Sequence, residues 1–190
     1  NTLWAFATLG YKNEPLFDQF SAQLLSKNDY LILEKFNPQD IANTLWACAS
    51  LGYENKPLFD QFFTYLLSEK GLLILEKFNP QAIANTLWAC ASLGYENKPL
   101  FAQFSTHLLS AIDQPIAEKI TSQDISNTLW AFASLGHQDQ NFFNKYAIYL
   151  LLGKQQPCTG FSTQEIANTL WAFAVQQALI NDTAPPLISI

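Results

Sequence analysis

The pattern of apolar and polar positions in this chain repeats at a fixed interval. The pentamer NTLWA begins at residues 1, 43, 85, 127 and 168, so the steps between units measure 42, 42, 42 and 41 residues. The stretch IANTLWACASLGYENKPLF occurs twice without change, from Ile41 and from Ile83. A fixed period of this length is typical of stacked-repeat proteins. We expect one array of units that begin near residues 1, 38, 80, 122 and 163.

The first half of each unit predicts a helix with recognisable ends. In the second unit Asn37 is a suitable N-cap, Pro38 fits the first helical position, and Gly52 stands where a left-handed C-terminal residue is expected. Later units open with the capping-box sequences TSQD and STQE. The helix is apolar around most of its circumference, which predicts that neighbouring helices cover it on several sides. A separate face is formed by Gln39, Asn43, Trp46 and Ser50.

A second helix is predicted after the turn YENK. Pro57 stands near its start, and an amphipathic stripe follows at helical spacing: Phe59, Phe62, Phe63, Leu66 and Leu67. The segment GLLILEKF from Gly71 predicts a short third helix or an extended connector, with the helix favoured. Each unit is then a helical hairpin whose apolar faces are covered only when units stack. The predicted fold class is all-α, an α-solenoid of stacked helical-hairpin repeats with a period of about 42 residues, right-handed by analogy with other helical repeats.

Composition and charge narrow the classes of partner. The net charge is −6, and the ten basic residues are all lysine. An acidic chain without arginine argues against strong, nonspecific phosphate binding, although a local positive stripe stays possible. The apolar runs are too short to span a bilayer, and no signal peptide opens the sequence, so no membrane partner is expected. Because the sequence starts inside a motif, we expect it to be an excerpt of a longer protein.

The cysteines and histidines do not form a catalytic or metal-binding motif. Cys48 and Cys90 take the repeat position that holds Phe132 and Phe173 in later units, which predicts buried thiols. Without a paired cysteine framework, Cys158 included, a reducing compartment is favoured, such as a bacterial cytoplasm, a host cell after secretion or an organelle. Metal-ligand spacing, a phosphate loop and a nucleophile elbow are missing from the sequence. We expect no enzyme activity, cofactor, metal or small-molecule substrate.

The repeated motif PQ-x-IANTLWA-x-A-x-LG resembles the octotricopeptide repeats of organellar RNA-processing proteins. It is also similar to the helical repeats of RAP-domain and FAST-kinase-like RNA-binding proteins. The match covers Pro38–Gly52, Pro80–Gly94, less closely Ser122–Gly136, and the shorter Asn1–Gly10 and Thr163–Ala174. The family's period is shorter, so the resemblance concerns the first helix. It implies an RNA-binding scaffold whose first helices line a concave surface and contact single-stranded RNA.

The candidate RNA contacts are the invariant Gln, Asn and Trp of the first helix and one variable position. Amides can bond base edges, and aromatic rings can stack on bases. The candidates are Gln39, Asp40, Asn43, Trp46, Gln81, Ala82, Asn85, Trp88, Gln123, Asp124, Asn127, Trp130, Gln164, Glu165, Asn168 and Trp171. Inter-repeat packing of Trp and an asparagine ladder are the structural alternatives.

Base discrimination requires a position that varies, because a residue identical in every unit cannot by itself distinguish one base from another. We interpret Asp40, Ala82, Asp124 and Glu165 as an exposed variable position, with capping as the alternative. A second, milder variable position is Ala42, Ala84, Ser126 and Ala167.

Three lysines recur in register just before the first helix: Lys35, Lys77 and Lys119. They are candidates for phosphate contacts, but a glutamate precedes each one, and a solvated charged edge is the alternative. Two functions from different classes remain. The first is an RNA-binding helical-repeat scaffold. The second is a protein–protein interaction scaffold, as in bacterial effector-like repeat proteins, which the acidity and the missing arginine favour.

Overall fold

The protein is helical throughout the residues that the computed structural model describes, which are 2–26, 31–152 and 160–183. The α-helices are α1 (Thr2–Thr8), α2 (Glu14–Leu24), α3 (Pro38–Ser50), α4 (Lys56–Leu66), α5 (Glu69–Leu75), α6 (Pro80–Leu93), α7 (Lys98–Ala111), α8 (Ser122–Ser134), α9 (Gln140–Leu152) and α10 (Thr163–Thr183). Two 3₁₀ helices, η1 (Leu33–Lys35) and η2 (Pro115–Lys119), lie in connecting segments. The predicted all-α class is therefore confirmed. No helix of the described ranges is both long and apolar enough to cross a membrane.

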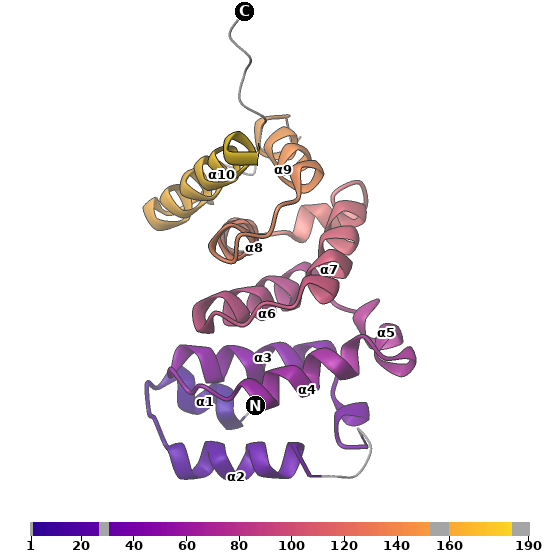
Figure 1. Cartoon of the computed structure of the whole chain (residues 1–190), viewed down its shortest axis with the longest axis vertical. Helices are drawn as coiled ribbons and strands as arrows, with labels where there is room; N and C mark the ends of the chain where they lie inside the picture. Colours follow the sequence, from indigo (N-terminus) through magenta and orange to yellow (C-terminus); the bar gives the residue numbers. More distant parts are fainter. Residues whose placement is uncertain (1, 27–30, 153–159, 184–190) are drawn as a thin grey trace, which may run out of the picture.

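The helices that carry the repeated motif lie side by side. In chain order α1 contacts α3, α3 contacts α6, α6 contacts α8, and α8 contacts α10. Figure 1 shows them following one another along the molecule, from the indigo N-terminal end to the yellow C-terminal end. We call α1, α3, α6, α8 and α10 the inner helices, and α2, α4, α7 and α9, each of which follows one of them in the chain, the outer helices.

The boundaries of the inner helices follow from local chemistry. The Asn37 side chain accepts a hydrogen bond from the backbone N–H of Asp40 at 2.9 Å, and the Asp40 carboxylate accepts one from the N–H of Asn37 at 3.2 Å. This reciprocal pair is the capping box. At the other end Gly94 has φ of +69°, the left-handed conformation that glycine adopts at little cost. The α10 helix has Gln176 and Gln177 in place of Leu-Gly and continues to Thr183.

The connecting segment after α4 forms the short helix α5, as the sequence favoured. Gly71 makes this possible, because a Cβ atom there would lie 1.8 Å from the carbonyl oxygen of Tyr65. Ser68 caps the helix by accepting a hydrogen bond from the N–H of Gly71 at 3.2 Å. Among the described residues of the corresponding segments before α3 and α8, the helical turns are the 3₁₀ helices η1 and η2.

The core lies between successive inner helices and between the inner and outer rows. Ile41, Leu45 and Cys48 of α3 are fully buried, as are Phe59 and Phe62 of α4. A fully buried side chain of this size contributes about 1.5–3 kcal/mol.

An aromatic contact recurs between consecutive units. It joins Phe17 to Tyr53 at 5.2 Å, Phe59 to Tyr95 at 5.0 Å, and Phe101 to His137 at 5.9 Å between ring centroids. The outer helices α2, α4 and α7 are thereby each fixed to the turn after the next inner helix.

Candidate nucleic-acid interface

The invariant amides and tryptophans form one face of the inner helices. We call this face the amide–tryptophan stripe, and its residues are Gln39, Asn43 and Trp46 of α3, Gln81, Asn85 and Trp88 of α6, Gln123, Asn127 and Trp130 of α8, and Gln164, Asn168 and Trp171 of α10. The glutamines are exposed and the asparagines are half-buried. Since the inner helices are adjacent, the stripe of each unit lies beside that of the next.

Contacts within the stripe link neighbouring positions and neighbouring units. The Gln39 Nε2 atom donates a hydrogen bond to Asn43 Oδ1 at 2.9 Å. The rings of Trp46 and Trp88, from consecutive units, have their centroids 6.4 Å apart with an angle of 34° between their planes. The stripe is therefore a continuous surface across the α3–α6 boundary.

The tryptophans combine packing with partial exposure. Trp46, Trp88 and Trp130 are half-buried and pack against the core. Trp4 and Trp171, in the first and last inner helices, are 44% and 46% exposed. Inter-repeat packing thus accounts for part of each central indole, and the remainder of the ring surface stays accessible. The stripe also extends to exposed Ser50, Ser92 and Ser134, which the helical spacing from Gln39 already placed on this face.

The variable position that we interpreted as exposed is not a solvent-facing position, and that interpretation is wrong. Ala82 is 1% exposed, Asp124 is 7% exposed, and Asp40 and Glu165 are half-buried. The position lies at the third residue of the helix, on the flank toward the preceding inner helix, so the stacked helix covers it. The burial raises the pKa of the Asp124 carboxyl, against hydrogen bonds from Thr121 that lower it.

The carboxylates at this position act as helix caps. The N–H of Thr121 donates to Asp124 Oδ2 at 3.0 Å, and the N–H of Ser162 donates to Glu165 Oε2 at 2.6 Å. Their variation therefore reflects alternative ways to close a helix start, which was the alternative interpretation. The milder variable position is also buried: Ala42, Ala84 and Ser126 are at most 1% exposed, and only Ala167 of α10 is exposed.

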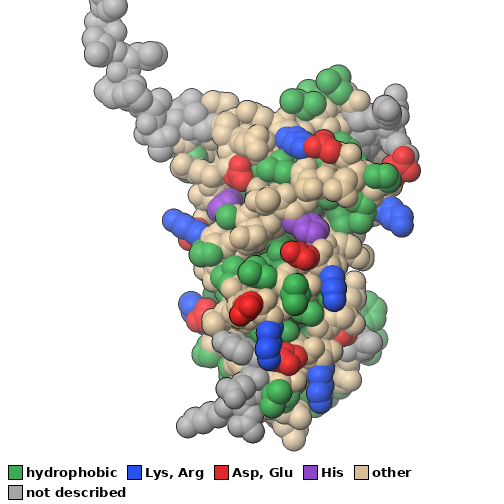
Figure 2. All heavy atoms as spheres, turned by 90° about the vertical axis from the view of Figure 1, so that its right-hand side faces the viewer, with side chains coloured by type: hydrophobic (Ala, Val, Ile, Leu, Met, Phe, Trp, Pro, Cys, Tyr) green, Lys and Arg blue, Asp and Glu red, His purple; other side chains and the backbone are tan. Residues whose placement is uncertain are grey.

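The in-register lysines are not part of the stripe and lie in the segments that lead into the inner helices. Lys35, Lys77 and Lys119 are exposed, and Glu34, beside the first of them, pairs with Lys70 at 2.6 Å. Figure 2 views the side on which α5 lies and shows lysine and acidic side chains interspersed there. This distribution matches the alternative of a solvated charged edge better than a continuous positive surface.

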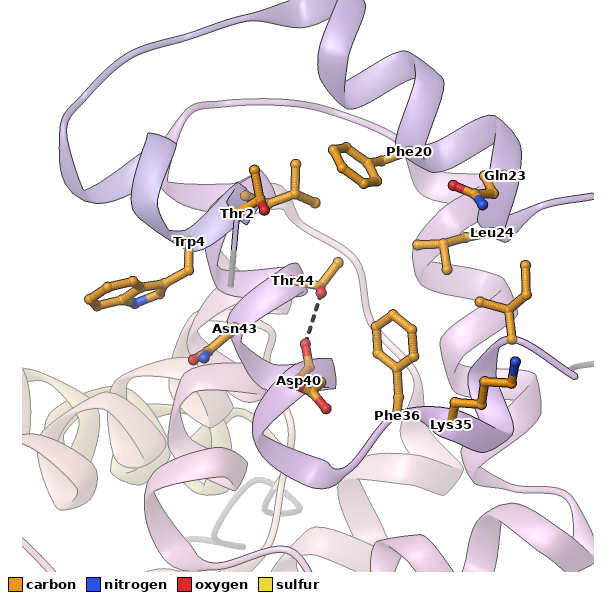
Figure 3. A pocket seen from close by; sticks show the side chains of 12 residues that line it. Thr2, Trp4, Phe20, Gln23, Leu24, Lys35, Phe36, Asp40, Asn43 and Thr44 are labelled. Atoms are coloured by element: carbon orange, nitrogen blue, oxygen red, sulfur yellow. Dashed lines mark hydrogen bonds between the residues drawn. The ribbon is translucent and has the colours of Figure 1, made fainter.

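One pocket brings several candidate residues around a common space. It measures about 390 Å³, and its lining includes Trp4, Lys35, Asp40, Asn43 and Thr44. Figure 3 shows Trp4 and Asn43 on one side of it and Lys35 with Phe36 on the other, with the Thr44 hydroxyl donating to the Asp40 carbonyl oxygen at 2.8 Å. Because Thr2 is the repeat equivalent of Thr44, this space corresponds to the first helical turn of the other units.

The thiols have the buried character that their repeat position predicted. Cys48 and Cys90 are both fully buried. Burial raises the pKa of Cys48 to about 12 and raises that of Cys90 as well, so both stay protonated at neutral pH. Cys158 lies outside the described residues. Within the described ranges, His, Cys, Asp and Glu side chains are nowhere grouped in threes that could hold a metal ion.

The fold and the stripe define a class of all-helical proteins whose successive inner helices repeat one amide- and tryptophan-bearing face. The chain belongs to the family described as RNA-editing substrate-binding complex 6 protein, RESC6, whose family model matches residues 1–179. No curated protein matches the chain. The family is RNA-associated by its description, whereas the specific resemblance to octotricopeptide repeats stays a prediction.

Proposed function

We propose that this chain is an RNA-binding helical-repeat scaffold whose amide–tryptophan stripe contacts single-stranded RNA. The observation that carries the proposal is the adjacency of stripes in consecutive units, with Trp46 and Trp88 only 6.4 Å apart. Membership of a family named for an RNA-editing substrate-binding complex supports an RNA-related role. The proposal includes a right-handed solenoid with the RNA along its concave inner face and about one nucleotide per unit, and it includes no catalytic step.

The chemistry of the stripe favours neutral contacts. Exposed glutamines can bond base edges or sugar hydroxyls, and stacking on a partly exposed indole contributes about 1–3 kcal/mol per base. The stripe itself carries no charge, and the chain's net charge is −6. We therefore expect binding that depends weakly on salt. Because the stripe is identical from unit to unit and the variable position is buried, we propose general contacts with little base discrimination.

The sharpest test changes residues that are exposed and so leave the fold intact. Gln39→Ala, Gln81→Ala and Gln123→Ala together should weaken binding of the full chain to a random single-stranded RNA pool. A net loss of about 1 kcal/mol per hydrogen bond predicts a dissociation constant at least tenfold higher. The matched control makes the same change three times at exposed glutamines off the stripe, Gln19, Gln103 and Gln138, and should bind as the wild type does.

A salt series distinguishes RNA contacts made by the stripe from phosphate contacts made by the lysines. Each phosphate contact to a single strand adds a slope of about −0.7 to the plot of log K against log salt. A triple change of Lys35, Lys77 and Lys119 to Ala should leave this slope almost unchanged if the RNA follows the stripe. Equal loss of affinity in both glutamine triples, or no RNA binding at about 50 mM salt, would contradict the proposal.

A protein partner is the second candidate for the same surface. The family name describes a complex, and the acidic, arginine-free composition disfavours strong phosphate binding. Under this alternative the glutamine triple would leave RNA affinity unchanged.

A further inference from the structure

The connecting segment before α8 differs from the one before α6 at a position that requires glycine. A Cβ atom at Gly71 would lie 1.8 Å from the carbonyl oxygen of Tyr65, so α5 needs a residue without a side chain there. The equivalent residue 42 positions later is Asp113. The later segment therefore cannot adopt the conformation of α5. Instead α7 continues to Ala111, and the 3₁₀ helix η2 begins at Pro115.

An ion pair that α5 makes is missing one unit later. Lys70 Nζ donates to Glu34 Oε1 at 2.6 Å and so connects α5 to η1. The residue equivalent to Glu34 is Glu76, whereas the residue equivalent to Lys70 is Ile112. Glu76 has no lysine at the matching position, and its carboxylate makes no ion pair or hydrogen bond with any described residue.

The same unit has a histidine where its two neighbours have tyrosine. In the fourth unit the Tyr149 hydroxyl donates to the carbonyl oxygen of Ala117 at 3.0 Å, which joins α9 to η2. The equivalent residue in α7 is His107, which is half-buried and forms no hydrogen bond or ring contact within the described part of the chain. Because an imidazole is shorter than a phenol, it does not bridge the corresponding gap.

A pocket of about 300 Å³ lies at this place, between the segment that leads into α6 and the end of α7. Its lining includes Glu76, Lys77, His107, Ser110, Gln114 and Ile116. We call it the junction pocket. Figure 2 shows histidine, lysine and acidic side chains on the same face of the molecule.

The junction pocket offers three hydrogen-bond acceptors. They are the carboxylate of Glu76, a ring nitrogen of neutral His107, and Oε1 of Gln114, whose Nε2 atom donates to Ser110 Oγ at 3.2 Å. A lysine ammonium carries three donors and no acceptor, so it complements this set. A phosphate would meet the carboxylate of Glu76, which is repulsive.

The lysine beside the pocket does not replace the missing cation. Lys77 is exposed and follows Glu76 in the sequence, as Lys35 follows Glu34. Within the chain Glu34 pairs with Lys70 although Lys35 is its neighbour. The presence of Lys77 is therefore compatible with a second lysine at Glu76.

We propose that the junction pocket docks a lysine side chain of a basic partner protein. Its ammonium pairs with Glu76 as Lys70 pairs with Glu34 within the chain, and its apolar stem lies along Ile116. The net charge of −6 favours the approach of a basic partner. The junction pocket shares no residue with the amide–tryptophan stripe, so the proposal does not depend on RNA binding there.

Proton NMR of the full chain tests the proposal, because His107 and His137 are its two histidines. The probe is the blocked tripeptide N-acetyl-Leu-Lys-Leu amide. It should shift the ring signals of His107, with a dissociation constant of about 1 mM, and leave those of His137 in place. The same tripeptide with norleucine instead of lysine lacks the ammonium and should shift neither. The signals are assigned by their loss in His107→Tyr.

Two variants and one matched control locate the contact. Glu76→Gln keeps the size of the side chain but removes its charge, and should raise the dissociation constant of the lysine tripeptide about fivefold. His107→Tyr introduces the residue of the neighbouring units and should abolish binding, measured on the lysine ε-protons of the tripeptide. Glu34→Gln is the control, because Lys70 already occupies that carboxylate, and should bind as the wild type does. Circular dichroism should show unaltered helix content in all three.

Several results would overturn the proposal. One is the absence of a shift at His107 with the lysine tripeptide at about 10 mM. Another is an equal shift with the norleucine tripeptide, since the ammonium would then not be recognised. Equal losses in Glu34→Gln and Glu76→Gln would place the contact outside the junction pocket. Weaker binding of single-stranded RNA by both Glu76→Gln and His107→Tyr would assign the junction pocket to RNA instead of a protein.

Discussion

The central inner helices and the end helices have nearly the same sequence but different surroundings. Leu87 of α6 and Leu170 of α10 occupy the same repeat position, yet one is fully buried and the other is 65% exposed. Both helices begin with a side-chain cap on a backbone N–H. The helix itself is therefore determined locally, whereas its burial is determined by the neighbouring units.

The largest expected effect on stability distinguishes burial by neighbouring units from the formation of the helix itself. Leu87→Ala should lower the free energy of unfolding by about 2–5 kcal/mol, because it leaves a cavity between stacked helices. Leu170→Ala, the same change at an exposed site, should stay within about 0.5 kcal/mol of the wild type. Urea denaturation at low protein concentration measures both. Equal losses for the two variants would mean that burial does not distinguish the end unit from the central units.

Removing a helix cap should cost the same stability in a central helix and in an end helix, because the hydrogen bonds of a cap lie within one helix. Asn79 accepts a hydrogen bond from the N–H of Ala82 at 2.8 Å, and Ser162 accepts one from the N–H of Glu165 at 3.3 Å. Asn79→Ala and Ser162→Ala should each cost about 1 kcal/mol. Hydrogen exchange of first-turn amides measures the loss in each helix. The controls Asn79→Asp and Ser162→Asp keep an acceptor and should retain protection, and a loss confined to one of the two alanine variants would contradict the local origin.

At the position of Ser126, a buried hydroxyl distinguishes α8 from the other central helices. Ser126 Oγ is buried and has no hydrogen-bond partner within the described part of the chain, and alanine occupies its position in α3 and α6. Ser126→Ala should raise the free energy of unfolding by about 1 kcal/mol, since an unpaired buried hydroxyl is costly. Ala167→Ser, at the equivalent exposed position of α10, should change it by only a few tenths. Destabilisation by Ser126→Ala in thermal or urea unfolding would contradict this account.

The difference between local and stacked features also explains how much the sequence could predict. The caps, the glycine ends and the amphipathic outer helices depend on residues within one segment, and these predictions are confirmed at Asn37, Gly94 and Phe59. The exposure of Asp40 and Ala82 depends on where the preceding inner helix lies, which periodicity within one helix cannot give. The stripe was predictable as a helix face, but the Trp46–Trp88 contact between units required the structure.

The smallest effect concerns pH and compares His137 with the tyrosines at its repeat position, Tyr53 and Tyr95. The His137 ring stacks on Phe132 with 5.0 Å between centroids. Burial lowers its pKa, and this outweighs Asp139 and Glu96, which raise it. Because the folded state favours the neutral imidazole, its contribution to stability is present above the ordinary histidine pKa near 6.5 and is lost as the pH falls through the lower folded value.

Replacing His137 by tyrosine, the residue at this position in the second and third units, should remove this dependence of stability on pH. A tyrosine stays neutral across the whole range, so His137→Tyr should lose less stability than the wild type between about pH 7 and about pH 5. Urea denaturation at both pH values gives the stability that each protein loses on acidification. The contributions of acidic groups common to both proteins cancel in the comparison. His107→Tyr makes the same substitution at the position of Tyr65 and Tyr149 and reports the effect of losing a histidine without the Phe132 contact. If His137→Tyr and the wild type lose equal stability on acidification, burial does not hold the ring of His137 in its neutral form, and the fourth unit does not differ from the second and third units in its response to pH.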